Sequence, residues 1–502
     1  MSQKNRWNEL VAYLAPIADV SGALSLLSWD QETMMPQGGS EPRAHQMGTL
    51  SRILHERYTD TRLKDLIDEA KSDVSAETRE AYIIRAVERQ YVNRTKLPAD
   101  LVVRRTELSA RARESWKAAR NADNFELFRP DLEEQVAVAR EVAECLGYKD
   151  HAYDALIDSF EPGLSYDWIS ARFDAIRPRL SDLIGRIAGK RREDSNQTEA
   201  EAVLVRRVSR NHQLEFGRTM AELVGYKFAN GRLDLSAHPF TSGSSYLDVR
   251  LTTRVLDTFF PSCLFSCIHE AGHGIHGQNI APDLYRLPFR YGLALAESQS
   301  RFYENVIGRS RVFWEYAFEK MRASITELSD ITLDQWYRGI NAVSPSLIRV
   351  EADEVTYGMH IMLRFELEFA LISGDLKVPD LPAAWNEKMQ SYLGIAPESD
   401  AKGVLQDIHW SQGAIGYFPD YLLGSMLSSQ LWQALQADLP DAETQVRAGS
   451  LAEVNAWMRE SVQRHGGLYT FAEIAQNATA QPFSAEPYLT YLEEKYWRLY
   501  GL

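Results

Sequence analysis

Apolar residues recur at helical spacing through most of this 502-residue chain. Between residues 5 and 191 they stand three or four positions apart among charged residues, as in 101–108, and few glycines interrupt them. This period is typical of amphipathic helices. We therefore expect one mainly helical unit over 1–502, in which about 1–190 form walls and cover and about 200–502 carry the chemistry.

Three stretches break the helical pattern. In 29–39, Pro36 and the glycine pair that follows predict a loop between two helices. Residues 189–197 are polar throughout, which indicates a solvated turn. Between 224 and 254, the segments 226–228 and 232–235 flank Asn230-Gly231 and predict a β-hairpin. A small sheet there would offer an edge to an extended peptide.

The strongest chemical signal is the H-E-x-x-H motif of residues 269–273. On a helix, a spacing of four residues turns the chain by about 400°, so His269 and His273 stand on one face and can hold one metal ion. Glu270 lies beside them, in the position of the general base of a zinc hydrolase. The alternative is a chance match in a chain with 11 histidines.

The residues around the motif support a helix. Pro261 suits a first helical turn, and Gly277 is predicted to end the helix. A buried apolar stripe is predicted from Leu264, Ile268, Ala271 and Ile275.

A catalytic zinc site usually has three protein ligands, so a third has to be found. Glu297, in a segment 293–304 that looks helical, returns 24 positions after His273 through a loop containing Pro282 and Pro288. Asp283 and Glu304 are weaker candidates. Taken alone, Glu297 also fits an exposed ion pair with Arg301.

His276 is not expected to be a ligand. It lies seven residues from His269, which is roughly 10 Å of helix rise and too far to share one ion. Metzincins have glycine and histidine where this chain has His276 and Asn279.

Composition fits a globular enzyme without nucleic-acid or membrane partners. The net charge of -15 disfavours nucleic acid and anionic lipid. The N-terminus lacks the apolar run of a signal peptide, and we expect no membrane span. Three cysteines are too few for a disulfide framework and indicate a reducing, cytoplasmic location. Cys263 and Cys267 are either small core residues or, less plausibly, metal ligands.

Several polar residues outside the motif have a local and a functional interpretation. Asp248 and Arg250 are predicted to form a local ion pair. Arg349 would either pair with Asp353 on one helix or clamp a carboxylate with two parallel hydrogen bonds. His238 alone is more typical of a structural or surface histidine.

The segment 403–421 is punctuated by glycines and rich in polar and aromatic residues, as binding loops often are. His409, Tyr417 and Tyr421 are candidate hydrogen-bond donors to a developing oxyanion, although aromatic packing also explains the tyrosines.

Together these motifs resemble the thermostable carboxypeptidase family, also called the carboxypeptidase Taq group of zinc metallocarboxypeptidases. The resemblance runs nearly end to end. The matching patterns, in order, are the 29–39 loop, His238-Pro239-Phe240, Asp248-x-Arg250-x-Thr252, the 269–273 motif, Glu297-Ser298-Gln299, Ile348-Arg349-x-x-Ala352-Asp353 and Gly403-x-x-Gln406-Asp407-x-His409-Trp410.

The resemblance implies a mainly α, saddle- or clam-shaped fold with a deep central groove and a small β-sheet beside the active site. It implies a homodimer that removes single residues from peptide C-termini with broad specificity, and poorly beside proline. One Zn²⁺ per subunit is the implied cofactor, with Co²⁺ or Mn²⁺ as substitutes.

By the same resemblance, His269, His273 and Glu297 are the metal ligands and Glu270 is the catalytic base. Arg349, expected to be unpaired in the groove, matches an arginine that binds the substrate's terminal carboxylate. The remaining matches hold the peptide backbone or the oxyanion, and they are His238, His409, Tyr417 and Tyr421.

One position departs from the family pattern. The family commonly has histidine before the ligand glutamate, where this chain has Ala296. A hydrogen bond from that side chain is therefore absent, with a possible shift in metal affinity or choice.

Two other functions remain open at this point. A helical zinc oligopeptidase would use the same motif to cut inside peptides. A non-catalytic peptide-binding scaffold would keep the metal for structure, but it would have no need of Glu270.

Overall fold

A computed structural model describes residues 3–192, 194–287 and 291–502. The expectation of a mainly helical chain with one small sheet is confirmed. Two positions used above, Glu193 in the polar turn and Pro288 in the loop before Glu297, lie outside the described residues. The division into a cover and a catalytic part stays a prediction.

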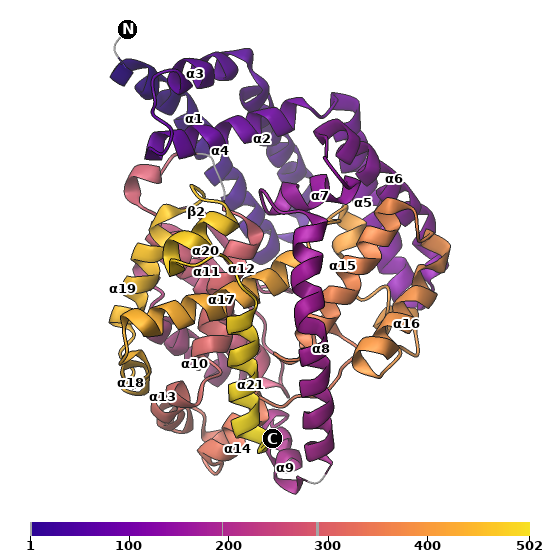
Figure 1. The fold of residues 1–502 in the computed structure, drawn as a ribbon, viewed down its shortest axis with the longest axis vertical. Coiled ribbons are helices and arrows are strands. Elements are labelled where there is room, and N and C mark those ends of the chain that lie inside the picture. The colour runs from indigo at the N-terminus through magenta and orange to yellow at the C-terminus, as the bar shows by residue number, and fades with distance from the viewer. Residues whose placement is uncertain (1–2, 193, 288–290) are drawn as a thin grey trace.

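The elements are numbered along the chain as in Figure 1. The α-helices are α1 (Gln3–Thr33), α2 (Ser40–Thr59), α3 (Thr61–Lys71), α4 (Arg79–Thr95), α5 (Ala99–Ala122), α6 (Arg129–Leu146), α7 (Ala152–Phe160), α8 (Tyr166–Arg191), α9 (Ser195–Leu204), α10 (Arg210–Val224), α11 (Phe260–Asn279), α12 (Leu293–Arg301), α13 (Arg311–Ser324), α14 (Leu333–Ile340), α15 (Tyr357–Ser373), α16 (Leu381–Leu393), α17 (Pro419–Asp438), α18 (Ala442–Arg447), α19 (Ala452–Ser461), α20 (Phe471–Thr479) and α21 (Glu486–Tyr500). The strands are β1 (Gly231–Leu235), β2 (Thr241–Ser245) and β3 (Asp248–Thr253).

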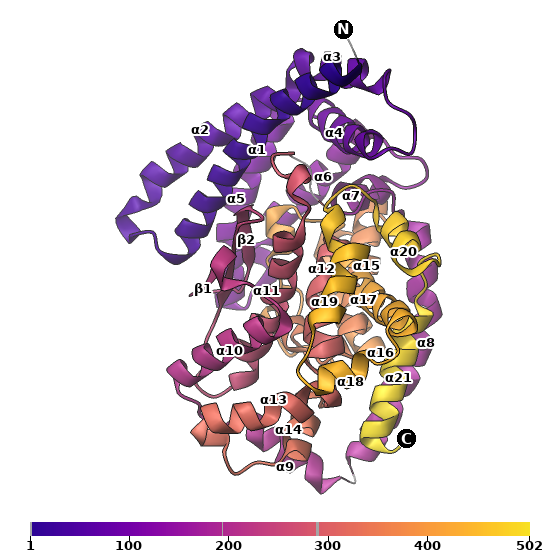
Figure 2. The same cartoon turned by 90° about the vertical axis from the view of Figure 1, so that its left-hand side faces the viewer.

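Helices α1 to α4 form a layer with an apolar core of its own. Their buried side chains cluster together and meet the rest of the molecule at Ala281, Leu284 and Leu468. Figure 2 shows this layer lying over β2 and the upper end of α11. The larger core begins at α5 and extends to the C-terminal helix.

The first helix differs from the sequence prediction in two ways. It continues to Thr33, so the predicted loop begins only at residue 34 and contains a short 3-10 turn, Gln37–Gly39. Contrary to expectation, its segment Arg6–Thr33 is long and apolar enough to cross a membrane by length and composition. A minority of that segment's most apolar stretch is buried in the structure.

The sheet has the order β1-β3-β2, with β1 parallel and β2 antiparallel to β3. The hairpin predicted around Asn230-Gly231 is therefore wrong. Residues Phe228–Asn230 form a 3-10 turn, and Tyr226 is buried with its hydroxyl donating to the carbonyl of Val249. Tyr226 thus serves as a core residue beneath the sheet, and the antiparallel pair forms later in the chain.

Candidate metal centre

The motif helix α11 begins with Pro261 in its first turn and buries the predicted stripe. It ends at Asn279 and not at Gly277, which the sequence predicted as its end. A Cβ at Gly277 would lie 3.3 Å from the side chain of Val249. This glycine therefore allows α11 to pack closely on β3 and does not terminate the helix.

Two glycines bring three helices unusually close together. A Cβ at Gly272 of α11 would lie 2.7 Å from the backbone of Ser300 in α12. On the other side of α12, a Cβ at Gly424 of α17 would lie 2.6 Å from the Cβ of Glu297. Real side chains do not pack at such distances, so both positions require glycine. Helix α12 is thereby held between the motif helix and α17.

This packing brings His269, His273 and Glu297 together. Their ligand atoms all lie within 4.8 Å of one another, and they form the one such group found among the described residues. The Nε2 atoms of the two histidines lie 3.6 and 3.7 Å from Oε2 of Glu297. Ligands about 2.0–2.2 Å from a tetrahedral ion stand about 3.3 to 3.6 Å apart, so the residues fit a zinc-sized ion.

Each histidine has a hydrogen-bond acceptor behind it that orients the ring. Nδ1 of His269 lies 2.8 Å from Oε2 of Glu304, and the backbone of Ala296 hydrogen-bonds to His273. Such outer partners fix the orientation of metal-binding histidines. Glu304 thus lies behind His269 and outside the group of three converging ligand atoms, which fits a positioning role. Ala296 lacks a polar side chain, but its backbone still contributes to the site.

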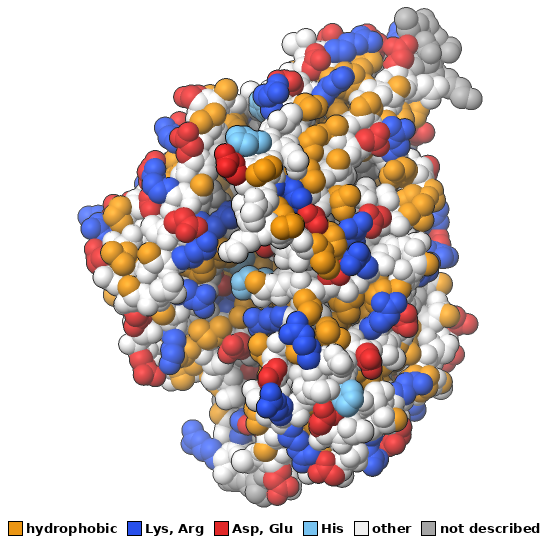
Figure 3. Space-filling view, turned by 180° about the vertical axis from the view of Figure 1, so that it is seen from behind, with side chains coloured by type: hydrophobic (Ala, Val, Ile, Leu, Met, Phe, Trp, Pro, Cys, Tyr) orange, Lys and Arg blue, Asp and Glu red, His pale blue; other side chains and the backbone are white. Residues whose placement is uncertain are grey.

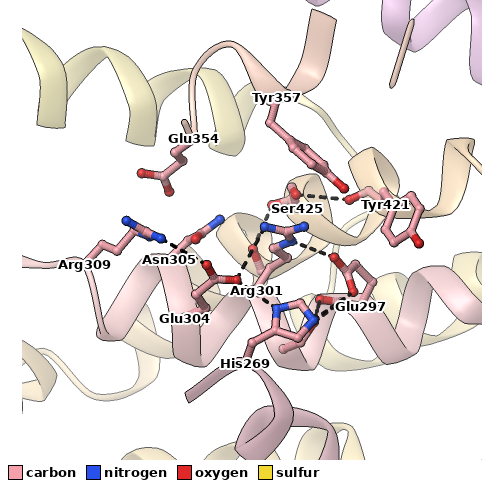
Figure 4. A network of polar contacts seen from close by, with 12 residues as sticks. His269, Glu297, Arg301, Glu304, Asn305, Arg309, Glu354, Tyr357, Tyr421 and Ser425 are labelled. Carbon is pink, nitrogen blue, oxygen red and sulfur yellow. Dashed lines mark hydrogen bonds and ion pairs between the residues drawn. The ribbon is translucent and has the colours of Figure 1, made fainter. Parts of the chain in front are cut away.

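The ligand carboxylate is itself held by two donors (Figure 4). Arg301 Nε donates to Oε1 of Glu297 at 2.6 Å, and Ser300 Oγ donates to Oε2 at 3.0 Å. The predicted Glu297–Arg301 pair is thus present, but it is buried and belongs to the site. Helix α12 continues as a π-helical turn, Phe302–Ile307, which carries Glu304.

The charges in this site balance one another. Burial disfavours protonation of His269, but Glu297 and Glu304 outweigh it and raise its pKa to about 9. Burial together with the charge of His269 lowers the pKa of His273 to about 4. Although burial alone would raise it, Arg301 and the histidines lower the pKa of Glu297. The carboxylates thus favour one positive charge between the two rings, which is where a metal ion would lie.

Glu270 lies next to the ligands and is buried. Its Oε2 accepts a hydrogen bond of 2.7 Å from Thr241 Oγ1 of β2. Burial raises the pKa of Glu270, while His269 and Thr241 oppose the shift. The sheet thus positions this carboxylate, and nothing in the sequence pattern identified Thr241.

The weaker ligand candidates lie elsewhere. His276 is buried against the ring of Tyr291, with ring centroids 4.1 Å apart. Asp283 pairs with Arg79 at the surface. Cys263 and Cys267 are free and buried, in agreement with a core role.

Comparison with known proteins identifies the family of this chain. The family model for "Carboxypeptidase Taq (M32) metallopeptidase" matches residues 9–496. The chain belongs to this family. It is 36% identical over 500 residues to carboxypeptidase 1 of Bacillus subtilis, covering 98% of each chain. Thermostable carboxypeptidase 1 of Thermus thermophilus is 35% identical over 515 residues, with full coverage of both.

A solved structure of the M32 carboxypeptidase from Deinococcus radiodurans R1 matches with a TM-score of 0.94 and 34% identity, covering 99% of this chain and all of that one. The fold and the resemblance expected from the sequence are therefore confirmed, and the chain is a metal-dependent peptide hydrolase of the carboxypeptidase class.

In this carboxypeptidase Taq family member, Arg349 differs from two sequence predictions. It lies in a 3-10 turn, Arg349–Glu351, and does not pair with Asp353, which caps the chain before α15. Nor is it unpaired, because Nε and Nη2 donate to Oδ1 of Asp407 at 3.0 and 2.9 Å. Its Nη1 donates to the hydroxyl of Tyr357 at 3.1 Å.

Asp407 holds a second buried arginine as well. Nε of Arg364 donates to Oδ2 of Asp407 at 2.7 Å. Two guanidinium groups thus share one paired carboxylate, which leaves an excess of positive charge. Because Asp407 is 58 residues from Arg349, no local spacing in the sequence indicates this pair.

The aromatic candidates gather beside this arginine. Nε2 of His409 lies 3.2 Å from the hydroxyl of Tyr421, whose ring lies 4.9 Å from the Arg349 guanidinium carbon. The ring of Tyr417 lies 5.2 Å from that of His409. His238 is exposed in the connection between β1 and β2 and has no side-chain partner among the described residues. Thr241, three residues later, is the nearer link to the motif.

Proposed function

We propose that this protein is a zinc carboxypeptidase that removes single residues from peptide C-termini, with broad specificity and poor cleavage beside proline. The observation that carries the proposal is the convergence of two histidine Nε2 atoms and one carboxylate oxygen, with Glu270 next to them. Co²⁺ or Mn²⁺ would be chemically acceptable substitutes for this nitrogen and oxygen donor set.

His269, His273 and Glu297 would hold the zinc ion. When bound, zinc acts as a Lewis acid and lowers the pKa of water toward about 7. In our proposal Glu270 takes the proton from the attacking water and passes it to the leaving amine. His409 and Tyr421 donate hydrogen bonds to the carbonyl oxygen of the scissile peptide as negative charge develops there.

The position of cleavage is assigned to the cluster of Arg349, Arg364 and Asp407. Its positive excess supports binding of a free terminal carboxylate. A substrate held in this way presents only its last peptide bond to the metal, which makes the enzyme an exopeptidase. Tyr417 and His238 are proposed to contact the peptide backbone.

The decisive experiment is mass spectrometry of a peptide after incubation with metal-stripped protein, and with protein reloaded with zinc or cobalt. The Glu270→Gln variant and a C-terminally amidated peptide run in parallel. A ladder that loses one C-terminal residue at a time, absent in the stripped and variant samples and for the amide, supports the proposal. Internal fragments would favour the oligopeptidase alternative, and no cleavage would favour the binding scaffold.

We also propose a cytoplasmic homodimer that binds neither nucleic acid nor membrane. The net charge of -15 disfavours binding to nucleic acid and to anionic membranes. Light scattering of the purified protein and fractionation of cells test these points. Recovery in the membrane fraction would instead favour a membrane role for the apolar segment Arg6–Thr33.

A further inference from the structure

A hollow of about 650 Å³ opens beside the loop that carries His409. One wall of the hollow is a single face of α5, and Gln412 completes it. The lining residues are Val102, Arg105, Thr106, Ser109, Ala110, Arg113, Glu114 and Gln412.

Gln412 of the hollow lies in a short 3-10 turn, His409–Gln412, which also carries His409. With three residues per turn, His409 and Gln412 project from the same side of this turn. Figure 2 shows α5 and β1 on the same side of the molecule, and the face seen in Figure 3 is hollowed near its centre. The hollow therefore lies one helical turn, about 6 Å of rise, from His409.

The basic residues of α5 differ according to the face that they occupy. On the faces away from the hollow, Arg104 pairs with Glu141, and Arg111 pairs with Asp131 and Glu134.

On the hollow face, Arg105 and Arg113 form no ion pair with any described residue. Both are exposed to the hollow. Glu114 at its rim already pairs with Lys117.

Acidic residues outnumber basic ones by 70 to 55 in this chain, yet no described carboxylate pairs with either arginine of the hollow face. The surrounding protein partly desolvates Arg105 and lowers its pKa, and no carboxylate compensates. A carboxylate that entered the hollow would supply the missing partner.

We infer that Arg105 and Arg113 bind acidic side chains of peptide substrates and give the enzyme a preference for Asp- or Glu-containing peptides. This inference rests on the proposed carboxypeptidase function. The two arginines stand eight residues apart, about 12 Å along the helix, so each contacts a different position of an extended peptide.

The test uses alanine-rich peptides with a free C-terminus and one Glu or one Gln at successive positions. For the wild type we expect kcat/KM for the Glu peptide to exceed that for the Gln peptide at one or two positions, by about threefold to fivefold per arginine. The ratio should fall to about one in R105Q/R113Q and decrease with added salt. R104Q is the matched control, since it removes the same charge from the same helix outside the hollow.

Binding of the same peptides to the Glu270→Gln variant separates this inference from the proposed catalysis. A tighter affinity for Glu than for Gln peptides that is lost on adding R105Q/R113Q supports the inference even if no cleavage is detected. An equal Glu-to-Gln ratio in the wild type and R105Q/R113Q, or an equal loss in R104Q, overturns it.

Discussion

Two groups of arginines differ in how their hydrogen-bond donors are used. One group is Arg301, Arg349 and Arg364, called the floor arginines, and the other is Arg105 and Arg113 of the α5 wall. Arg349 and Arg364 are buried and Arg301 is largely so, and their donors reach carboxylates, a hydroxyl and a backbone carbonyl. Arg105 and Arg113 are exposed to a hollow and have no ion-pair partner among the described residues. A guanidinium that is already paired with a protein carboxylate positions that partner and can share its charge with a ligand, whereas one that is accessible and has no ion-pair partner can offer all its donors to a ligand.

The contrast predicts a graded response to mutation. Loss of a carboxylate that pairs with a floor arginine leaves a buried positive charge uncompensated, which lowers the stability of the fold or weakens metal binding. Loss of an arginine on the wall should leave stability intact and change only which peptides are preferred.

The largest effect is expected for Asp407→Asn. This change leaves Arg349 and Arg364 without their shared negative charge, so the free energy of unfolding should fall by about 3–5 kcal/mol. Urea denaturation measures the loss. The control is Asp334→Asn, which removes an exposed partner of Arg311 and should cost less than about 1 kcal/mol. Similar values for the two variants would contradict the assignment of Asp407 as a structural charge.

The second prediction concerns Glu304→Gln, which weakens the acceptor behind His269. Metal affinity should decrease about 10- to 100-fold, because His269 loses the charge that orients it. Competition with a chelator measures the affinity. Glu315→Gln, which alters a surface pair with Arg447, should leave the affinity unchanged. An unchanged affinity in Glu304→Gln would show that the ring is positioned by packing alone.

A third region contains buried carboxyl groups that lie close to one another. Neither carboxylate oxygen of buried Asp420 has a hydrogen-bond partner in the described part of the chain. Burial, and after it the charges of Glu161 and Glu368, raise the pKa of Asp420 well above its usual value. Burial likewise raises the pKa of Glu161 to about 8, although the Ala294 amide donates to it. Because the pKa of Glu161 is higher in the folded than in the unfolded state, its protonated carboxyl group contributes to the free energy of unfolding. This contribution is fully present below about pH 4.5 and is lost as pH rises through about 8.

Asp420→Asn removes the like charge that opposes ionisation of Glu161. The free energy of unfolding of the wild type should decrease from about pH 6 to about pH 9. In Asp420→Asn this decrease should be smaller by about 1–2 kcal/mol. Urea denaturation at both pH values measures the difference. Asp334→Asn should follow the wild type, and an Asp420→Asn curve parallel to the wild type would show that Asp420 does not influence the ionisation of Glu161.

The smallest effect is expected on the α5 wall. Arg105→Gln and Arg113→Gln should each change the free energy of unfolding by less than about 0.5 kcal/mol, because neither loses an ion pair. Thermal unfolding measures this directly. A clear destabilisation by either variant would mean that the hollow arginines also support the fold.

Local patterns predicted much of this molecule. The helical period, the spacing of His269 and His273 and the position of Glu297 all depend on contacts within one or two neighbouring helices, so the sequence reveals them. The same limitation explains the misses. Pairing of β1 with β3 and of Arg349 with Asp407 joins segments that the chain brings together from a distance.

The sequence predicted the position of Glu304 only in part. Its spacing from Glu297 placed it on the correct face, but only the packing of α11 against α12 shows that it contacts Nδ1 of His269 rather than the ion. Thr241 and the unpaired state of Arg105 depend on surroundings that no sequence period encodes.

The glycine contacts that hold α12 also bear on the choice between ions of different radius. Gly272 on one side and Gly424 on the other let the neighbouring helices approach α12 so closely that a Cβ at either position would clash. A larger or smaller ion has to be accommodated by rotation of the Glu297 side chain, which Arg301 and Ser300 restrain. Helix spacing would therefore limit the size of the ion that His269, His273 and Glu297 can hold.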